Sequence, residues 1–276
     1  MNPLVSICCI TYNQKNFIRD ALEGFLMQQT SFPFEILIHD DASTDGTPEV
    51  IHEYEKQYPN IIKAICQPEN KYSQGESINE LYNFPRAKGK YLALCEGDDY
   101  WTDPLKLQKQ VDLLETYPNM GMVCTGFTTL DMSTNSIHKQ SAGNESAMLR
   151  GSMDRGKIVT ATTLFRKSLY EQYAAKLDIE NIRFWKMNDY PLWMWFLKKS
   201  SVFYLSDVTS VYRILPASAS HFQHDWSRAQ QFHQSFIEIT QYLHEKKIIT
   251  HAEYAQEVSA IYCHHCRTFI MAGNWR

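Results

Sequence analysis

Three acidic residues lie within four positions of the chain, directly after an apolar run with the length of a buried strand. The run is Leu92–Cys95, and the acids are Glu96, Asp98 and Asp99 in the sequence E-G-D-D-Y-W. An unpaired charge is costly to bury, so these carboxylates must emerge where the strand ends. Clustered carboxylates repel one another, and a hard divalent cation relieves that repulsion while also holding phosphates. The spacing predicts a metal and phosphate site, although aspartates in this position could also serve only a turn and a helix cap.

Two earlier strand-like runs end in polar side chains in the same way. Residues 4–10 are followed by Thr11-Tyr12-Asn13, and residues 34–39 are followed by D-D-A-S-T-D-G-T at positions 40–47. Open α/β sheets bind their ligands at the carboxyl ends of the strands, so these turns are candidates for one ligand site. The alternative is that their polar residues serve only the turns and the start of the next helix.

The alternation of strand-like and helix-like segments predicts an α/β fold with a mostly parallel sheet. The expected strands are residues 4–10, 34–39, 61–66, 90–95 and 120–127, and 202–205 and 208–212 are expected as two edge strands. The expected helices are residues 17–26, 48–58, 105–117, 162–175 and 192–199, with a short one at 77–82. Residues 130–156 lack periodicity and are expected to form a loop.

The C-terminal part of the chain has a different pattern. From Phe222 the apolar residues recur at helical spacing, which predicts a helix that docks on the sheet domain or on a partner. Thr250 and Glu253 have the spacing of a capping box and predict one last helix to about residue 270.

Composition narrows the class of protein. The chain has 276 residues and a net charge of −4, without a basic run, which argues against a nucleic-acid partner. Seven cysteines, several of them inside apolar runs, are typical of a reducing compartment. No signal peptide and no run of about 20 apolar residues are recognisable. We expect a cytoplasmic protein, and peripheral contact with the inner face of the membrane stays open.

The motifs, taken in order, resemble those of the inverting nucleotide-sugar glycosyltransferases of family 2, which have the GT-A fold. The order is T-Y-N, D-D-A-S-T-D-G-T and E-G-D-D-Y-W after successive strands, then N-D before an aromatic helix. The resemblance covers about residues 4–221. It implies a Rossmann-like GT-A domain at 1–221, with a nucleotide-binding half at 1–100 and an acceptor-binding half at 101–221. Residues 222–276 form a helical extension outside the resemblance, through which a homo-oligomer could form.

The resemblance implies a nucleotide pocket at the ends of the first two strands. The residues that would line the base and ribose are Ile10, Thr11, Tyr12 and Asn13. Asp41, with Asp40 as its neighbour, would hydrogen-bond the nucleotide base.

The resemblance also implies a divalent metal, Mn²⁺ or Mg²⁺. Asp98 matches the acid near the ribose and the metal, and Asp99 matches a direct metal ligand. Glu96 stands where many family members have an aspartate, and its side chain is longer by one methylene. Arg213 and His221 lie in Y-R-I-L-P-A-S-A-S-H, which resembles the loop that closes over the diphosphate, and would contact phosphate or metal.

Asp189 falls where the family places its catalytic base. One carboxylate within reach of the acceptor hydroxyl is enough for transfer with inversion, because no protein nucleophile is then needed. On the residues alone, Asp189 could instead cap the helix that contains Pro191.

Motifs and resemblance together predict hexosyl or N-acetylhexosaminyl transfer from a nucleoside diphosphate sugar, with UDP as the nucleotide. The acceptor would be a saccharide or a lipid-linked saccharide in cell-envelope polysaccharide synthesis. A catalytically inactive nucleotide-binding or assembly module of the same fold is one alternative. A sugar-phosphate nucleotidyltransferase is another, but its glycine-rich loop is missing after the first strand. A dinucleotide-dependent oxidoreductase would need G-x-G-x-x-G there, and T-Y-N-Q-K-N has no glycine.

Overall fold

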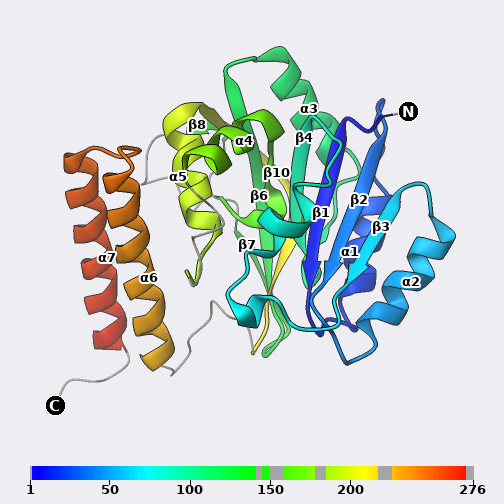
Figure 1. The fold of residues 1–276 in the computed structure, drawn as a ribbon, viewed down its shortest axis with the longest axis horizontal. Coiled ribbons are helices and arrows are strands. Elements are labelled where there is room, and N and C mark those ends of the chain that lie inside the picture. The colour runs from blue at the N-terminus through cyan, green and yellow to red at the C-terminus, as the bar shows by residue number, and fades with distance from the viewer. Residues whose placement is uncertain (1, 141–144, 150–157, 178–184, 217–225, 272–276) are drawn as a thin grey trace.

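The computed structural model describes residues 2–140, 145–149, 158–177, 185–216 and 226–271. In it a ten-stranded mixed sheet has helices on both faces, and two long C-terminal helices stand at one end of the molecule (Figure 1). The strands are β1 Val5–Thr11, β2 Phe34–Asp40, β3 Ile62–Cys66, β4 Tyr91–Glu96, β5 Tyr100–Trp101, β6 Met120–Asp131, β7 Ser136–Gln140, β8 Ala147–Leu149, β9 Leu164–Arg166 and β10 Ser201–Ile214. The α-helices are α1 Ile18–Leu26, α2 Thr47–Gln57, α3 Lys106–Thr116, α4 Lys167–Lys176, α5 Asp189–Lys199, α6 Trp226–Glu245 and α7 His251–Met271.

The order of the strands brings the polar strand ends together. The sheet runs β3-β2-β1-β4-β9-β6-β10-β5, and its first four strands are parallel. Ile10 of β1 lies opposite His39 of β2 on one side and Glu96 of β4 on the other. The three strands therefore end level with one another, and the turns that follow them share one edge of the sheet.

The sheet is apolar on both faces, as expected for strands covered by two layers of helices. Side chains alternate between two cores: Ile7, with 0% of its surface exposed, packs with α1–α3, and Cys8, also at 0%, packs with α4 and α5. Burial raises the pKa of the Cys9 and Cys95 thiols well above the usual value. These thiols therefore act as small hydrophobic groups in the core, as the sequence indicates.

The second half of the sheet differs from the sequence prediction in three places. The helix expected at 162–175 is wrong at its start, because Leu164–Arg166 is a strand and α4 begins at Lys167. Strand β9 pairs antiparallel with both β4 and β6, which buries Phe165 completely. A segment of three residues carries too little periodicity to separate a strand from a helix, so this long-range pairing cannot be read from the sequence.

The two expected edge strands are one strand, β10, with register shifts between Leu205 and Val208. It pairs with β6 along one side and with β5 and β8 along the other, so it is not an edge strand. The loop expected over 130–156 contains β7 and β8, and the short helix expected at 77–82 is a π-helical turn at Asn79–Asn83. The short strands within 130–156 are missed in the sequence because they are stabilised by tertiary pairing rather than by local pattern, whereas the helix expected at 77–82 is present as this turn.

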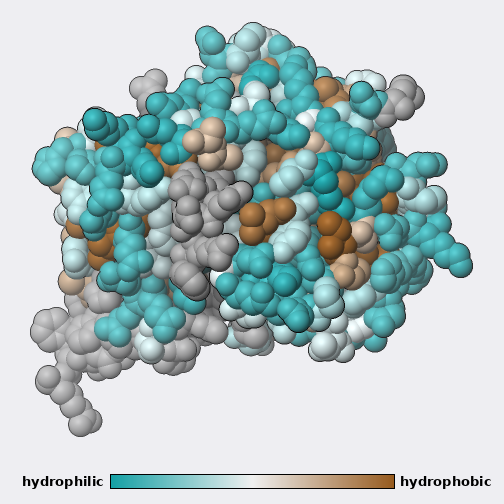
Figure 2. Space-filling view, viewed as in Figure 1, coloured by the Kyte–Doolittle hydropathy of each residue, from teal (hydrophilic) through white to brown (hydrophobic). Residues whose placement is uncertain are grey.

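The C-terminal helices dock on the domain, one of the two outcomes expected from the sequence. Ile239 and Leu243 of α6 have none of their surface exposed and belong to the same core as α4 and α5. The capping box of α7 is confirmed, since Glu253 Oε2 accepts from Thr250 N at 2.8 Å and Glu253 N donates to Thr250 Oγ1 at 3.3 Å. Within the described residues, no helix combines the length and the apolar character needed to cross a bilayer. The face in Figure 2 is mostly hydrophilic, with small scattered hydrophobic patches.

Candidate active site

The turns after β1 and β4 approach each other closely at Gly97. A Cβ atom on this residue would lie 2.6 Å from Gln14 Oε1 and 2.8 Å from Thr11 Oγ1. Those two oxygens are buried and have no hydrogen-bond partner within the described part of the chain. A glycine between the acids of E-G-D-D thus lets the turn after β4 pack against the polar end of β1, where two acceptor atoms are left without a partner.

The turns after β1 and β2 are hydrogen-bonded to each other. Asn13, with a φ of 52°, donates its backbone N–H to Ser43 Oγ at 2.7 Å, and its Oδ1 accepts from Thr44 N at 2.8 Å. Asn13, predicted to line the nucleotide, therefore also holds the second turn in place. Of the other residues predicted to line the nucleotide, Ile10 is half-buried, and half of the Tyr12 surface is exposed.

Asp40 and Asp41 are both buried and already accept hydrogen bonds from neighbouring loops. Asp40 accepts from Ser43 N at 3.0 Å and from Ser43 Oγ at 2.5 Å, and burial raises its pKa while these bonds oppose the rise. Asp41 accepts from Lys71 N at 2.8 Å and from Tyr72 N at 3.0 Å. The described geometry therefore gives Asp41 a role in anchoring the loop that contains Tyr72. Recognition of a base by Asp41 stays a prediction.

Arg213 holds the acidic turn rather than reaching into solvent. Its backbone N–H donates to Asp99 Oδ1 at 2.8 Å, and its Nη1 donates to the carbonyl oxygen of Asp98 at 2.7 Å. Its Nη2 pairs with Asp20 of α1, and the guanidinium carbon lies 4.4 Å from the centre of the Tyr100 ring. Only 6% of Arg213 is exposed. The phosphate contact predicted for Arg213 would require it to leave these partners, whereas His221 lies outside the described residues.

The acidic turn carries more negative charge than Arg213 balances. Burial raises the pKa of Glu96 to about 8, with the Asp98 charge adding to the effect. Burial also raises the pKa of Asp98, and raises the pKa of Asp99 well above its usual value, against the opposing charge of Arg213. A bound cation would reverse these shifts, because it favours the ionised carboxylates.

The residues of this turn fit a divalent cation in charge but form only part of a ligand set. Asp98 is half-buried, and the Gln14 side chain opposes the rise in its pKa, whereas Asp99 is 2% exposed and accepts a hydrogen bond from Arg213 N on one of its oxygens. Among the described residues, no three His, Cys, Asp or Glu side chains converge as a metal site. Phosphate oxygens often complete the coordination of Mg²⁺ beside one or two carboxylates, so a partial set is compatible with metal-dependent nucleotide binding.

Asp189 is placed close to the acidic turn. It is the first residue of α5 and is half-buried, and its charge is near enough to add to the raised pKa of Glu96. Burial raises the pKa of Asp189 itself. The indole N–H of Trp193, one helical turn later, lies outside hydrogen-bonding geometry but opposes that rise.

Glu80 is a site residue that the sequence did not indicate. It belongs to the π-helical turn at Asn79–Asn83, and burial together with the Asp189 charge raises its pKa to about 7. Single π-helical turns occur often at functional sites. No feature of the sequence identifies Glu80, because it lies in a polar stretch without a motif. Only folding of the chain brings it within reach of the Asp189 charge.

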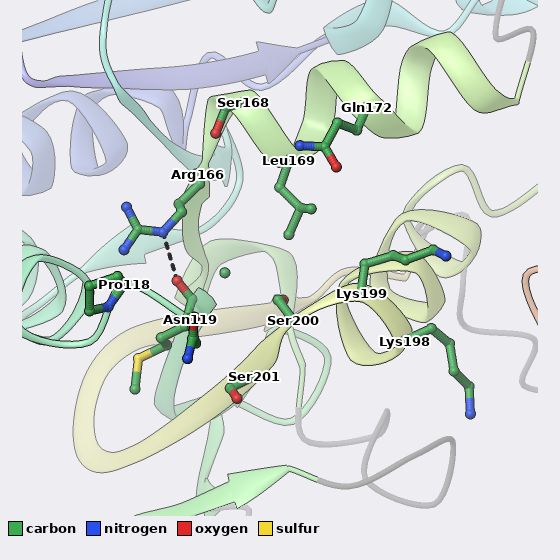
Figure 3. A pocket seen from close by; sticks show the side chains of 12 residues that line it. Pro118, Asn119, Arg166, Ser168, Leu169, Gln172, Lys198, Lys199, Ser200 and Ser201 are labelled. Atoms are coloured by element: carbon green, nitrogen blue, oxygen red, sulfur yellow. Dashed lines mark hydrogen bonds between the residues drawn. The ribbon is translucent and has the colours of Figure 1, made fainter.

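A cavity of about 570 Å³ lies at the opposite edge of the sheet (Figure 3). It is lined by Met120 and Ser201, the first residues of β6 and β10, while the acids follow the carboxyl end of β4. Two of its three cations are already engaged, since Lys198 pairs with Glu253 and Arg166 Nε donates to Met120 O at 2.8 Å. This cavity is separate from the candidate active site.

The buried His39 shows how far water is excluded from the end of β2. It has no exposed surface, its ring stacks on Tyr82 at 4.6 Å, and its Nδ1 has no partner within the described residues. Burial lowers the pKa of His39 to about 4. The unfolded chain therefore binds a proton between pH 6.5 and 4 that the folded chain does not, so stability falls with falling pH in that window.

We expect the difference in unfolding free energy between the parent and His39→Gln to shrink by about 2 kcal/mol from pH 7.5 to pH 5. Glutamine does not titrate, so the comparison isolates the histidine from all other groups. Urea unfolding at both pH values measures the difference. A parent-to-variant difference that is the same at both pH values would contradict the burial of a neutral His39.

Comparison with known proteins gives the family. Residues 6–196 match the model of glycosyl transferase family 2. This chain belongs to that family. Among relatives in the family, the chain is 52% identical over 114 residues to the uncharacterized protein Rv1520 of Mycobacterium tuberculosis, covering 41% of this chain and 32% of that protein. It thus spans about a third of the length of that relative.

A second relative covers most of both chains. The putative teichuronic acid biosynthesis glycosyltransferase TuaG of Bacillus subtilis is 27% identical over 231 residues, 83% of this chain and 85% of that one. Among solved structures, TarS 1–349 of S. aureus in complex with UDP-GlcNAc covers 94% of this chain and 71% of its own, with a TM-score of 0.70 and 18% identity. The mannosyltransferase PcManGT of Pyrobaculum calidifontis, in complex with GDP-Man and Mn²⁺, covers 100% and 77%, with a TM-score of 0.61 and 18% identity. The structural matches confirm the predicted GT-A fold of this family 2 member.

Proposed function

We propose that this family 2 member is an inverting, metal-dependent glycosyltransferase. It transfers a hexosyl or N-acetylhexosaminyl group from a nucleoside diphosphate sugar, with UDP as the first candidate nucleotide. The observation that carries the proposal is the Asp189 carboxylate, whose charge adds to the raised pKa of Glu96 in the acidic turn, at the edge where three parallel strands end. Such an arrangement provides a proton acceptor, Asp189, and a separate site for a phosphorylated leaving group at the acidic turn.

The chemistry follows from the two parts of the site. Departure of a nucleoside diphosphate leaves negative charge on phosphate, and a divalent cation bound at Asp98 and Asp99 would supply the neutralising charge. Asp189 accepts the proton of the acceptor hydroxyl as that oxygen attacks the sugar. Its raised pKa makes the ionised carboxylate a stronger base than an exposed aspartate. One displacement without a protein nucleophile inverts the configuration of the sugar.

The substrates are proposed from the relatives. The named role of TuaG in teichuronic acid biosynthesis supports a saccharide or lipid-linked saccharide acceptor in cell-envelope polysaccharide synthesis. The UDP-GlcNAc bound to TarS supports a UDP-sugar as the donor. The Mn²⁺ bound to PcManGT supports a metal, and its GDP-Man makes a GDP-sugar the second candidate donor. An enzyme with these substrates would work in the cytoplasm, at the inner face of the membrane where a lipid-linked acceptor is presented.

Two alternatives keep the same fold. An inactive nucleotide-binding or assembly module would bind nucleotide without turnover. A sugar-phosphate nucleotidyltransferase would consume a nucleoside triphosphate and a sugar phosphate. Neither needs a carboxylate such as Asp189 beside the acidic turn, which is why we favour sugar transfer.

A panel of nucleotides tests the proposal. We expect UDP or GDP with Mn²⁺ at about 100 times its dissociation constant to raise the melting temperature by about 5 °C, because a ligand that binds the native state stabilises it. The same panel then screens UDP-glucose, UDP-N-acetylglucosamine and GDP-mannose for release of the nucleoside diphosphate. Stabilisation without release from any donor, with saccharide acceptors present, would support the inactive module. Consumption of a nucleoside triphosphate with a sugar phosphate would support the nucleotidyltransferase.

A further inference from the structure

The C-terminal helices pack against the helix that begins with Asp189. Helices α6 and α7 form a hairpin that stands beside α5, at the end of the molecule opposite α2 (Figure 1). Ile239 and Leu243 of α6 are fully buried in the core that also contains Trp193 and Phe196 of α5. We call residues 226–271 the C-terminal hairpin.

The hairpin contacts the chain on both sides of Asp189. Before it, Lys186 N donates to Ser235 Oγ at 3.2 Å, and the Trp185 ring lies 5.2 Å from that of Tyr242. Both of these contacts come from helix α6.

After it, the ring of Tyr190 lies 5.0 Å from that of Phe236 in an edge-to-face contact. The Tyr190 hydroxyl is 3.4 Å from Thr240 Oγ1 and 3.4 Å from Glu257 Oε2. Asp189 therefore sits between two groups of contacts made by the hairpin, and the hydroxyl of its neighbour is shared by both helices.

These contacts matter because the start of α5 lacks the usual local fixation. Helices commonly begin with a side chain that accepts a hydrogen bond from the first turn. Asn188 occupies the capping position of α5 but makes no such bond, and its buried Oδ1 has no partner among the described residues. Without a cap from Asn188, the orientation of the first turn depends more strongly on what packs against it.

We propose that Tyr190 is a positioning residue for sugar transfer and that the C-terminal hairpin, through Tyr190 and Ser235, sets the orientation of Asp189. The proposal rests on the proposed function, in which Asp189 is the base. A base must reach the acceptor hydroxyl within hydrogen-bond distance, and small displacements of a reacting group are costly in rate. The hairpin thereby becomes part of the catalytic domain rather than a separate appendage.

The test compares Tyr190→Phe with the parent in the full-length protein. Phenylalanine keeps the ring against Phe236 and removes only the hydroxyl. We expect kcat for nucleotide release from UDP-glucose or UDP-N-acetylglucosamine, whichever the enzyme uses, to fall about tenfold. The KM for that donor and the affinity for UDP with Mn²⁺ should stay within about twofold, because Tyr190 lies outside the nucleotide pocket.

Lys198→Gln is the matched control. Lys198 pairs with Glu253 of the hairpin at the far end of α5, so its loss weakens the same packing without changing the turn at Asp189. We expect kcat of this control within about twofold of the parent. An equal fall in both variants would show a general stabilising role and overturn the proposal. A Tyr190→Phe rate within twofold of the parent would overturn it as well.

A double variant distinguishes an effect of Tyr190 on the position of Asp189 from an effect on the stability of the protein. In an Asp189→Asn background, Tyr190→Phe should produce almost no further fall in kcat, because the group that it orients is gone. A full tenfold fall in that background would contradict the proposal. If Tyr190→Phe does not fold, Ser235→Ala removes the contact on the other side of Asp189 and should give the same pattern. If Asp189→Asn alone keeps parent activity, the base assignment fails first, and the two failures are thus distinguishable.

Discussion

Asp189→Asn should lower the rate of sugar transfer about 10³-fold while leaving nucleotide binding intact. Asparagine matches aspartate in size and keeps a polar group at the start of α5, but it cannot take a proton from the acceptor hydroxyl. Asp189 is half-buried beside the acidic turn, and burial raises its pKa, as expected for a group that must hold a proton briefly. Donor turnover measures the first effect, and calorimetry with UDP and Mn²⁺ measures the second.

Glu80→Gln is the informative control for that experiment. Glu80 carries a carboxylate whose pKa is raised to about 7 by burial and by the Asp189 charge, so it shares the same electrostatic environment. We expect its loss to change turnover by less than about tenfold, because removing a neighbouring charge alters the pKa of the base without removing the base. If Glu80→Gln abolishes transfer and Asp189→Asn does not, the base is Glu80 instead.

The edge of the sheet that carries the site could be predicted because its strand ends are visible in the sequence. Apolar runs that stop at Thr11, Asp40 and Glu96 end within one residue of each other in the folded sheet. The parallel half of the sheet could be predicted from the alternation of strands and helices, since buried parallel strands appear in the sequence as continuous apolar runs. The order of the motifs then gave the family.

The partners of the site residues could not be predicted in the same way. Arg213 was expected to contact phosphate because of its place in a loop motif, and the structure pairs it with Asp20, 193 positions away in sequence. Phe165 reaches its position through strand pairings that join distant segments, and Glu80 comes within reach of the Asp189 charge only in the folded chain. Local pattern carries no information about such contacts, since side-chain neighbours across a sheet depend on strand order rather than on spacing.

The contacts of Arg213 also change what is expected of the two aspartates. Asp99 accepts a hydrogen bond from the Arg213 backbone and is almost completely buried, whereas Asp98 is half-buried and gives Arg213 only its backbone oxygen. Asp98→Asn should therefore weaken the binding of UDP in the presence of Mn²⁺ about 100-fold, equivalent to about 2.7 kcal/mol for one charged contact. When a chelator replaces the metal, the parent and Asp98→Asn should bind UDP with nearly the same affinity. Calorimetry under both conditions gives the two numbers.

Two further variants, Asp99→Asn and Asp112→Asn, are compared with Asp98→Asn in the same binding measurement. In Asp99→Asn the amide oxygen can still accept from Arg213 N, so the turn keeps its shape and only the charge is lost. Asp112 is an exposed acid on α3, and its variant should bind UDP and Mn²⁺ like the parent, which controls for net charge. A larger loss for Asp99→Asn than for Asp98→Asn would place the principal metal contact on the buried acid, as the family resemblance implies. Unchanged binding in both site variants would mean that the acidic turn holds no metal, and the raised pKa values of its carboxyls would then reflect burial alone.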